Sequence, residues 1–280
     1  MTDTKKKELQ IFATKARMGV LEGVYNAKAG HPGGSLSICD VLSVLYNTEL
    51  RVDPKNPKAE NRDRFVLSKG HAAPALYATL ALKGFFPVED LKTLRKSDSY
   101  LQGHPNMDKV PGVDMSTGSL GQGISTAVGM ALGAKLDNAD YRVYTILGDG
   151  ELQEGQVWEA AMFAGNNKLD NLVAVVDFNK LQIDGSLDEV NSPCPIDEKF
   201  LAFGWNVIVI DGHNFDEIES AFKAARECKG KPTCIVANTI KGKGVSFMEN
   251  ECDWHGSAPK LDQYNQAMEE LNKTLADLEA

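Results

Sequence analysis

The feature that most constrains the fold is a regular alternation of apolar runs and helical segments between Tyr141 and Asn238. Apolar runs occupy 141–147, 172–176, 206–210 and 233–238, and segments with helical spacing (154–166, 196–203 and 215–228) separate them. A shorter apolar run covers 64–67. Continuous apolar strands separated by helices are typical of a parallel sheet buried on both faces. The sequence therefore predicts an α/β fold with about five parallel strands and helices on both faces.

Helical periodicity predicts the remaining elements. The expected helices are 9–27, a second that Ser35 caps and that runs to about Asn47, then 72–83, 88–96, a close-packed Ala/Gly-rich helix over 123–136, and a C-terminal helix over 261–278. No internal repeat or linker divides the chain. We therefore expect residues 1–280 to form a single domain.

Bulk composition narrows the class of function. Lys and Arg total 30 and Asp and Glu total 39, giving a formal charge of −9, which argues against nucleic acid or an anionic membrane as the main partner. No apolar stretch approaches the ~18 residues of a membrane span, and no secretory signal follows the polar N-terminus. The five cysteines form no C-x-x-C pair, as expected of free thiols in a reducing cytosol. These features predict a cytoplasmic protein.

Asp149 and Asn179 lie directly after two apolar runs, about one βαβ unit apart. Neighbouring parallel strands would present both side chains at one rim of the sheet, where α/β folds bind ligands. Hard oxygen ligands beside the Gly148–Gly150 turn suit Mg²⁺ and a diphosphate. A strand-terminal turn that binds nothing explains the same residues about equally well.

Four of the five histidines lie in turns flanked by Gly or Pro: His31, His71, His104 and His255. A single loop histidine is usually a solvated or capping residue. Four on separate connections are expected to converge at one rim of a parallel sheet, and histidine suits proton transfer near neutral pH. His213, after Asp211-Gly212, is predicted to be an exposed turn residue.

Three segments resemble the thiamine diphosphate motif of transketolases: Gly148–Gly155, Trp158–Ala161 and Asp177–Gly185. The similarity extends from Gly30 to Gly256. It implies thiamine diphosphate with Mg²⁺, for which Ca²⁺ or Mn²⁺ can substitute. The metal ligands implied are Asp149, Asn179 and the carbonyl of Leu181.

The resemblance also implies roles for other residues. His31, His104 and His255 would act on substrate oxygens, and the cofactor would be contacted by His71, Gly118, Ser119, Leu120, Asp149, Gly150, Glu154 and Asn179. Glu154 matches a glutamate whose hydrogen-bond network crosses to the partner subunit. Two positions depart from the family pattern, Phe178 and Ser119, and neither removes a ligand. The Thr239–Gly244 segment lacks P-loop spacing and is expected to be a mobile loop or a solvated basic turn.

The resemblance covers only the N-terminal part of a transketolase. It implies one subunit of a split enzyme of carbohydrate (pentose phosphate) metabolism, a transferase that moves a two-carbon ketol unit from a ketose to an aldose. A separate C-terminal, pyrimidine-binding subunit would complete the enzyme as a heterotetramer, and we expect Met1 and the closing helix to be natural ends. The alternatives are the α subunit of a thiamine-dependent 2-oxo acid dehydrogenase and a non-catalytic binding or regulatory protein.

Overall fold

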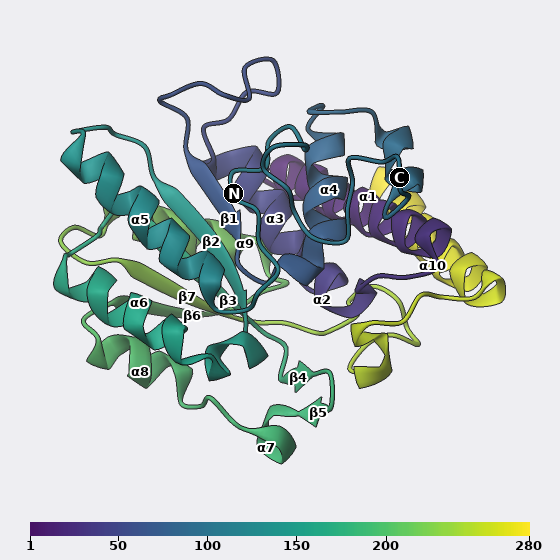
Figure 1. Ribbon diagram of the computed structural model, residues 1–280. Helices are drawn as coiled ribbons and strands as arrows, with labels where there is room; N and C mark the ends of the chain where they lie inside the picture. The colour runs from purple at the N-terminus through teal and green to yellow at the C-terminus, as the bar shows by residue number, and fades with distance from the viewer.

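The computed structural model describes residues 1–280 and contains a five-stranded parallel sheet between two helical layers (Figure 1). The strand order is β1-β2-β3-β7-β6 and every neighbouring pair is parallel. The strands are β1 (Arg64–Leu67), β2 (Val143–Gly148), β3 (Leu172–Phe178), β6 (Asn206–Asp211) and β7 (Thr233–Asn238). The predicted α/β class, the strand count and the parallel arrangement are confirmed.

Alternate residues of each central strand enter two separate apolar cores, as the two-residue period of a strand requires. On β2, Tyr144 and Ile146 join one core while Val143 and Leu147 join the other. The second core lies under α5 (Gln122–Leu136), α6 (Gly155–Asn166) and α8 (Ile196–Ala202), which cover one face of the sheet in Figure 1. Burial on both faces explains why these strands are apolar throughout.

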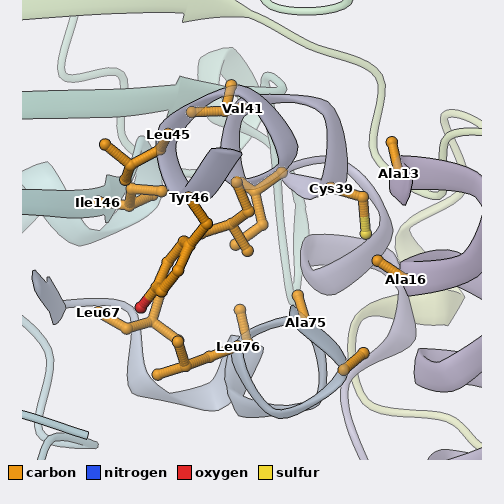
Figure 2. Close-up of a cluster of buried hydrophobic side chains, with 14 of the residues drawn as sticks. Ala13, Ala16, Cys39, Val41, Leu45, Tyr46, Leu67, Ala75, Leu76 and Ile146 are labelled. Carbon is orange, nitrogen blue, oxygen red and sulfur yellow. The ribbon is translucent and has the colours of Figure 1, made fainter. Parts of the chain in front are cut away.

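The opposite face carries the larger core, which is covered by N-terminal helices and by α9 (Phe215–Glu227). The N-terminal helices are α1 (Asp3–Ala27), α3 (Cys39–Val44) and α4 (Ala73–Leu82). In Figure 2, Tyr46 reaches toward Leu67 of β1 and Leu76 of α4. The last helix, α10 (Leu261–Glu279), packs along α1, where the rings of Tyr25 and Tyr264 stack with centroids 4.2 Å apart.

The prediction of one helix from Ser35 to Asn47 was wrong. The segment forms α2 (Pro32–Leu36), α3 and a π-helical turn, η1 (Leu45–Glu49). Ser35 lies inside α2, where its hydroxyl donates to the carbonyl of His31 at 2.7 Å and caps nothing. The helix is interrupted at Ile38 (φ −97°, ψ 0°), next to Ser37, whose hydroxyl donates to the Asp177 carboxylate at 2.7 Å. The interruption therefore lies beside a contact between distant residues, which the helical period does not reveal.

Several short elements were not predicted or differ from the prediction. The expected helix over 88–96 is a 3₁₀-helix, η3 (Val88–Thr93). After β3 the chain forms a hairpin of β4 (Leu181–Gln182) and β5 (Gly185–Ser186), followed by α7 (Leu187–Val190). Single 3₁₀ turns occur at η2 (Gly70–Ala72), η4 (Gly150–Gln153) and η5 (Cys252–His255). None of the helices is both long enough and apolar enough to cross a lipid bilayer.

The contact between α6 and the end of α8 depends on Gly165. A Cβ atom at Gly165 would lie 1.8 Å from the Phe203 carbonyl oxygen, whereas one at Gly133 on α5 would meet no atom within 4 Å. We expect Gly165→Ala to lower the free energy of unfolding by about 1–3 kcal/mol through overpacking. The matched change Gly133→Ala should raise it by about 0.5–1 kcal/mol. Urea unfolding followed by circular dichroism checks both, and equal effects of the two changes would refute the close contact.

Candidate active site

The carboxyl ends of β2 and β3 place Asp149 and Asn179 at one rim. The register pairs Gly148 with Asp177, so Asp149 follows its strand by one residue and Asn179 follows the paired position by two. Both side chains line a cavity of about 200 Å³. The same cavity is lined by Leu120, Gly150, Glu154, Leu181, His71 and His255. The structure thus gathers eight of the sequence-predicted site residues around one cavity.

A buried ion pair between Lys69 and Asp177 forms the base of the site. The Lys69 ammonium lies 2.6 Å from the Asp177 carboxylate, and the two side chains are 1% and 0% exposed. Lys69 also donates to the Gly34 carbonyl at 2.7 Å. Asp177 accepts from the hydroxyls of Ser37 and Thr239 as well. Burial alone would raise the pKa of Asp177, but Lys69 and these donors hold it below its ordinary value.

Asp177 also fixes the orientation of Asn179. The Asn179 amide Nδ2 donates to Asp177 Oδ2 at 2.9 Å, so its carbonyl oxygen Oδ1 must lie on the opposite side, where it accepts from the Leu181 backbone N–H at 3.1 Å. The Leu181 carbonyl accepts from the Lys241 ammonium at 3.1 Å. The amide oxygen and the backbone oxygen are therefore held in defined positions at the same turn.

Asp149 is buried without a cation. Its side chain is 2% exposed and forms no salt bridge. It accepts only two backbone N–H groups, from Gly150 at 2.8 Å and Lys180 at 2.5 Å. Burial, and then the nearby Asp177 carboxylate, raise the pKa of Asp149 to about 7. A carboxylate buried without a counter-charge is costly, so a bound cation would stabilise it.

Glu151, which the sequence did not single out, braces the turn between β2 and α6. Its carboxylate accepts from the Ser68 hydroxyl and from the backbone N–H groups of Gly121 at 2.9 Å and Gly148 at 3.0 Å. Burial raises its pKa, which these donors oppose. Glu154, the predicted cofactor contact, is exposed at the mouth of the cavity.

The four loop histidines come together in space. His31 lies at the centre, with ring centroids 5.3 Å from His71, 5.6 Å from His255 and 6.5 Å from His104. His71 and His255 stack at 5.1 Å. His71 and His255 line the cavity, whereas His31 and His104 lie beyond it. Two of the four imidazole rings therefore border the cavity that Asp149 lines, and the other two extend the cluster beyond that cavity.

All four imidazoles are held neutral. Burial and neighbouring cations lower the pKa of His31 to about 4 and that of His255 to about 3, and burial lowers the pKa values of His71 and His104. Lys241 lies 3.0 Å from Nδ1 of His255, so the ammonium donates to that nitrogen and the ring proton resides on Nε2. Nδ1 of His31 is buried and has no partner in the chain. Neutral imidazoles can both donate and accept a proton.

The prediction that His213 is an exposed turn residue was wrong. Its Nε2 accepts the backbone N–H of Ile240 at 2.8 Å, and its Nδ1 lies 2.7 Å from the Asp40 carboxylate. Asp40 also forms a bidentate pair with the buried Arg17. His213 therefore ties the segment after β7 to α1 and α3. Sequence spacing gives no sign of a carboxylate that lies 173 positions away.

Of the three neighbouring residues predicted to contact the cofactor, Gly118, Ser119 and Leu120, only Leu120 lines the cavity. Gly118 has a φ of +152°, and a Cβ there would lie 3.0 Å from the His104 ring, so glycine lets the two loops approach. Leu120 lines the cavity. Ser119 is exposed and does not line it. Ser119 stays a predicted cofactor contact.

Two buried lysines are further site residues that the sequence analysis missed. Lys69 and Lys241 are each 1% exposed and line the cavity. The signal for Lys69 was its place between β1 and His71 in Ser68-Lys69-Gly70-His71. Lys241 was expected in a mobile or solvated loop, yet burial lowers its pKa to about 8. Their ammonium groups make this wall of the cavity suitable for an anion.

Comparison with known proteins shows one family. A family model described as "Transketolase, thiamine diphosphate binding domain" matches residues 9–274. The chain is 52% identical over 266 residues to the 6-deoxy-6-sulfo-D-fructose transketolase subunit SqwG of Clostridium sp. (strain MSTE9), covering 95% of this chain and 97% of that protein. It is 45% identical to one of the subunits of an apulose-4-phosphate transketolase from Phocaeicola vulgatus, covering 97% and 96% respectively.

Longer proteins match over part of their length. The crystal structure of transketolase from Campylobacter jejuni superposes with a TM-score of 0.90 at 37% identity, covering 97% of this chain and 43% of that one. Human transketolase is 42% identical, and the chain covers 42% of its length. The chain thus spans less than half of these longer relatives.

The Lys69–Asp177 pair generates a stability prediction. We expect Lys69→Met to lower the free energy of unfolding by about 3–5 kcal/mol, because it leaves a buried carboxylate unpaired. The control Lys135→Met removes a more exposed pair with Asp170, with side chains 38% and 23% exposed, and should cost at most about 1 kcal/mol. Urea unfolding at neutral pH measures both. A loss for Lys69→Met no larger than the control would show that the pair does not organise the rim.

Proposed function

The chain belongs to the transketolase family, whose thiamine diphosphate-binding domain it matches over residues 9–274, and from that membership we propose that it is the cofactor-binding half of a split transketolase. The observation that carries the proposal is the cavity where Asp149, Asn179 and Leu181 meet two of the clustered histidines. In this proposal the enzyme transfers a two-carbon ketol unit from a ketose to an aldose.

A separate partner would supply the pyrimidine-binding half. Two relatives that the chain matches over 96–97% of their length are named as transketolase subunits, which supports a split enzyme. We propose that the partner is a C-terminal subunit, that the two form a heterotetramer, and that residues 1–280 are one domain. All five cysteines are free thiols, which supports a cytoplasmic location.

The donor set fits a divalent cation beside a diphosphate. No group of three His, Cys, Asp or Glu side chains could hold a metal, so a cation here needs amide and backbone oxygens. Asp149, Asn179 and the Leu181 carbonyl supply one charged and two neutral oxygens, and Mg²⁺ characteristically completes such a set with phosphate oxygens and water. Gly150 and the two buried lysines would receive the diphosphate.

When bound, thiamine diphosphate supplies the nucleophilic carbon and electron sink for making and breaking a carbon–carbon bond. The protein's part is position and proton transfer. Neutral His31, His104 and His255 can donate to a developing oxyanion and accept a hydroxyl proton. Lys241 fixes the ring proton of His255 on Nε2, the nitrogen that can donate. His71, at the cavity wall, would contact the cofactor.

The names of the relatives guide the substrate proposal. One is named for 6-deoxy-6-sulfo-D-fructose and another for apulose-4-phosphate, and both compounds are sugars with an anionic end group. We propose the same class of substrate for this chain, within carbohydrate metabolism of the pentose phosphate type. The family match argues against the α subunit of a 2-oxo acid dehydrogenase. Asp149, Asn179 and His255, which line one cavity, argue against a non-catalytic role.

Cofactor binding tests the half-site. We expect thiamine diphosphate with Mg²⁺ to bind this chain weakly and to bind the reconstituted pair at least about tenfold more tightly, because the pair encloses both ends of the cofactor. Isothermal titration calorimetry of the chain, the partner and the mixture measures this. Equally tight binding by the single chain, or none by the pair, would overturn the proposal.

The acidity of Asp149 predicts the pH dependence of metal binding. Its pKa is raised to about 7, so below pH 7 a cation must displace a proton, and affinity should fall by up to about tenfold per pH unit. Above pH 7 the affinity should level off.

Asp149→Asn should abolish metal-dependent cofactor binding, while the exposed neighbour Asp184→Asn should leave it unchanged. Mn²⁺ titration by electron paramagnetic resonance at several pH values checks this. Unchanged Mn²⁺ affinity in Asp149→Asn would contradict the ligand assignment.

A further inference from the structure

His213 uses both of its ring nitrogens, and it joins α3 to the segment that follows β7. Nε2 accepts the backbone N–H of Ile240 at 2.8 Å, so the ring proton must lie on Nδ1. Nδ1 lies 2.7 Å from the Asp40 carboxylate, to which it therefore donates. The two contacts together require a neutral imidazole with its proton on Nδ1.

The Asp40 end of this connection is rigid. Asp40 is 4% exposed, and the Arg17 guanidinium of α1 donates to its two oxygens at 2.9 and 2.6 Å. Burial would raise the pKa of Asp40, but Arg17 and then His213 outweigh burial and lower the pKa to about 2. Asp40 therefore stays ionised and keeps accepting the hydrogen bond from Nδ1. In this way His213 is anchored to both α1 and α3.

Gly212 brings the turn after β6 against the segment after β7. Its N–H donates to the Asn238 carbonyl at 2.8 Å, and a Cβ atom at position 212 would lie 2.5 Å from Cγ2 of Thr239. Only a residue without a Cβ allows so close an approach. Ile240 follows Thr239 directly, so the same approach places the Ile240 N–H against the His213 ring.

Lys241, the next residue, carries this position into the cavity of the candidate active site. Its side chain is buried and lines that cavity. The ammonium donates to the Leu181 carbonyl at 3.1 Å and to Nδ1 of His255 at 3.0 Å. A displaced Lys241 would release both contacts, and Nδ1 of His255 would then be free to take the ring proton.

The bond to His213 is the one side-chain bond that holds the backbone between Ile240 and Gly242. The other anchors are bonds between backbone groups. The Gly242 N–H donates to the Gly33 carbonyl at 3.0 Å, and the Lys241 carbonyl accepts a further N–H at 2.9 Å. A substitution at His213 can therefore remove one anchor and leave the others in place.

We propose that His213 is a positioning residue for the transfer reaction: it fixes the backbone that carries Lys241 and thereby keeps the ring proton of His255 on Nε2. The proposal rests on the transketolase function proposed above and deepens it. His213 lines no part of the cavity, so it acts through Lys241 and not on substrate or cofactor. The result is a pair of opposite tautomers, with the proton on Nδ1 in His213 and on Nε2 in His255. The Nε2–H group of His255 is the donor available to a developing oxyanion.

Two substitutions of His213 separate its two contacts. Gln places its amide group where Nε2 lies and can accept from Ile240, whereas Asn places its amide where Nδ1 lies and can only donate to Asp40. The matched control is Asn214→Ala at the same turn. Asn214 caps α9 by accepting its first N–H groups, and it forms no hydrogen bond with Ile240 or Asp40.

Kinetics of the reconstituted pair, at saturating thiamine diphosphate and Mg²⁺, test the proposal. His213→Asn should lower kcat by roughly 5- to 20-fold and leave KM for the ketose within about twofold, because a misplaced donor weakens the transition state. His213→Gln should recover most of that loss. Asn214→Ala should keep kcat within about twofold of wild type, although it lowers the urea midpoint about as much as His213→Asn does. Unchanged kcat in His213→Asn, equal losses for Gln and Asn, or an equal loss in the control would overturn the proposal.

Heteronuclear NMR of the imidazole nitrogens reads the tautomers in the single chain and needs no activity. At mildly alkaline pH the wild-type chain should show the proton on Nδ1 of His213 and on Nε2 of His255. His213→Asn should turn His255 into a mixture of both tautomers, and His213→Gln should keep the wild-type pattern.

Two NMR outcomes would overturn the positioning role. One is a His213 proton on Nε2 in the wild-type chain, which requires no variant to fold, and the other is an unchanged His255 ring in His213→Asn. If the pair shows no transketolase activity while the tautomers behave as expected, the proposed function fails and the positioning of His255 stands.

Discussion

The burial of Lys69 and Asp177 as an ion pair is the interaction on which the organisation of the site depends. A charge in a protein interior is tolerated only when it is paired and its remaining hydrogen-bonding positions are filled. Asp177 meets that condition because its carboxylate pairs with Lys69, which follows β1, and accepts hydrogen bonds from two hydroxyls. These belong to Ser37, after α2, and Thr239, after β7. One carboxylate at the end of β3 thereby joins segments from distant parts of the chain. The same carboxylate orients the Asn179 amide.

Polar groups at this rim fall into two kinds. Asp177, Glu151 and Asp40 find their donors within the chain, and they serve the fold. Asp149, Nδ1 of His31 and the Arg95 guanidinium do not find comparable partners. Since unsatisfied buried polar groups are costly, those that remain indicate where ligands supply the missing interactions. At Asp149 the complementary charge is a cation.

Much of the fold could be predicted from the sequence because it follows from local patterns. Apolar runs in β2, β3 and β7 can be stable only between two layers, and the spacing of Asp149 and Asn179 places both at one rim. The convergence of four loop histidines follows from the same topology. What could not be predicted depends on contacts between distant residues. His213 contacts Asp40, the Ser37 hydroxyl reaches Asp177 beside the helix interruption at Ile38, and the buried Lys241 contacts His255.

In the proposed site, Asp149, Asn179 and the Leu181 carbonyl hold the cation that the buried carboxylate requires. An anomalous-scattering crystal structure with thiamine diphosphate and Mn²⁺, collected near the manganese edge at a pH above 7, would locate that cation. We expect one strong peak about 2.1 Å from an oxygen of each of these three residues, with diphosphate oxygens completing the shell. Bound diphosphate without a cation at Asp149, or a peak held by other side chains, would contradict the assignment.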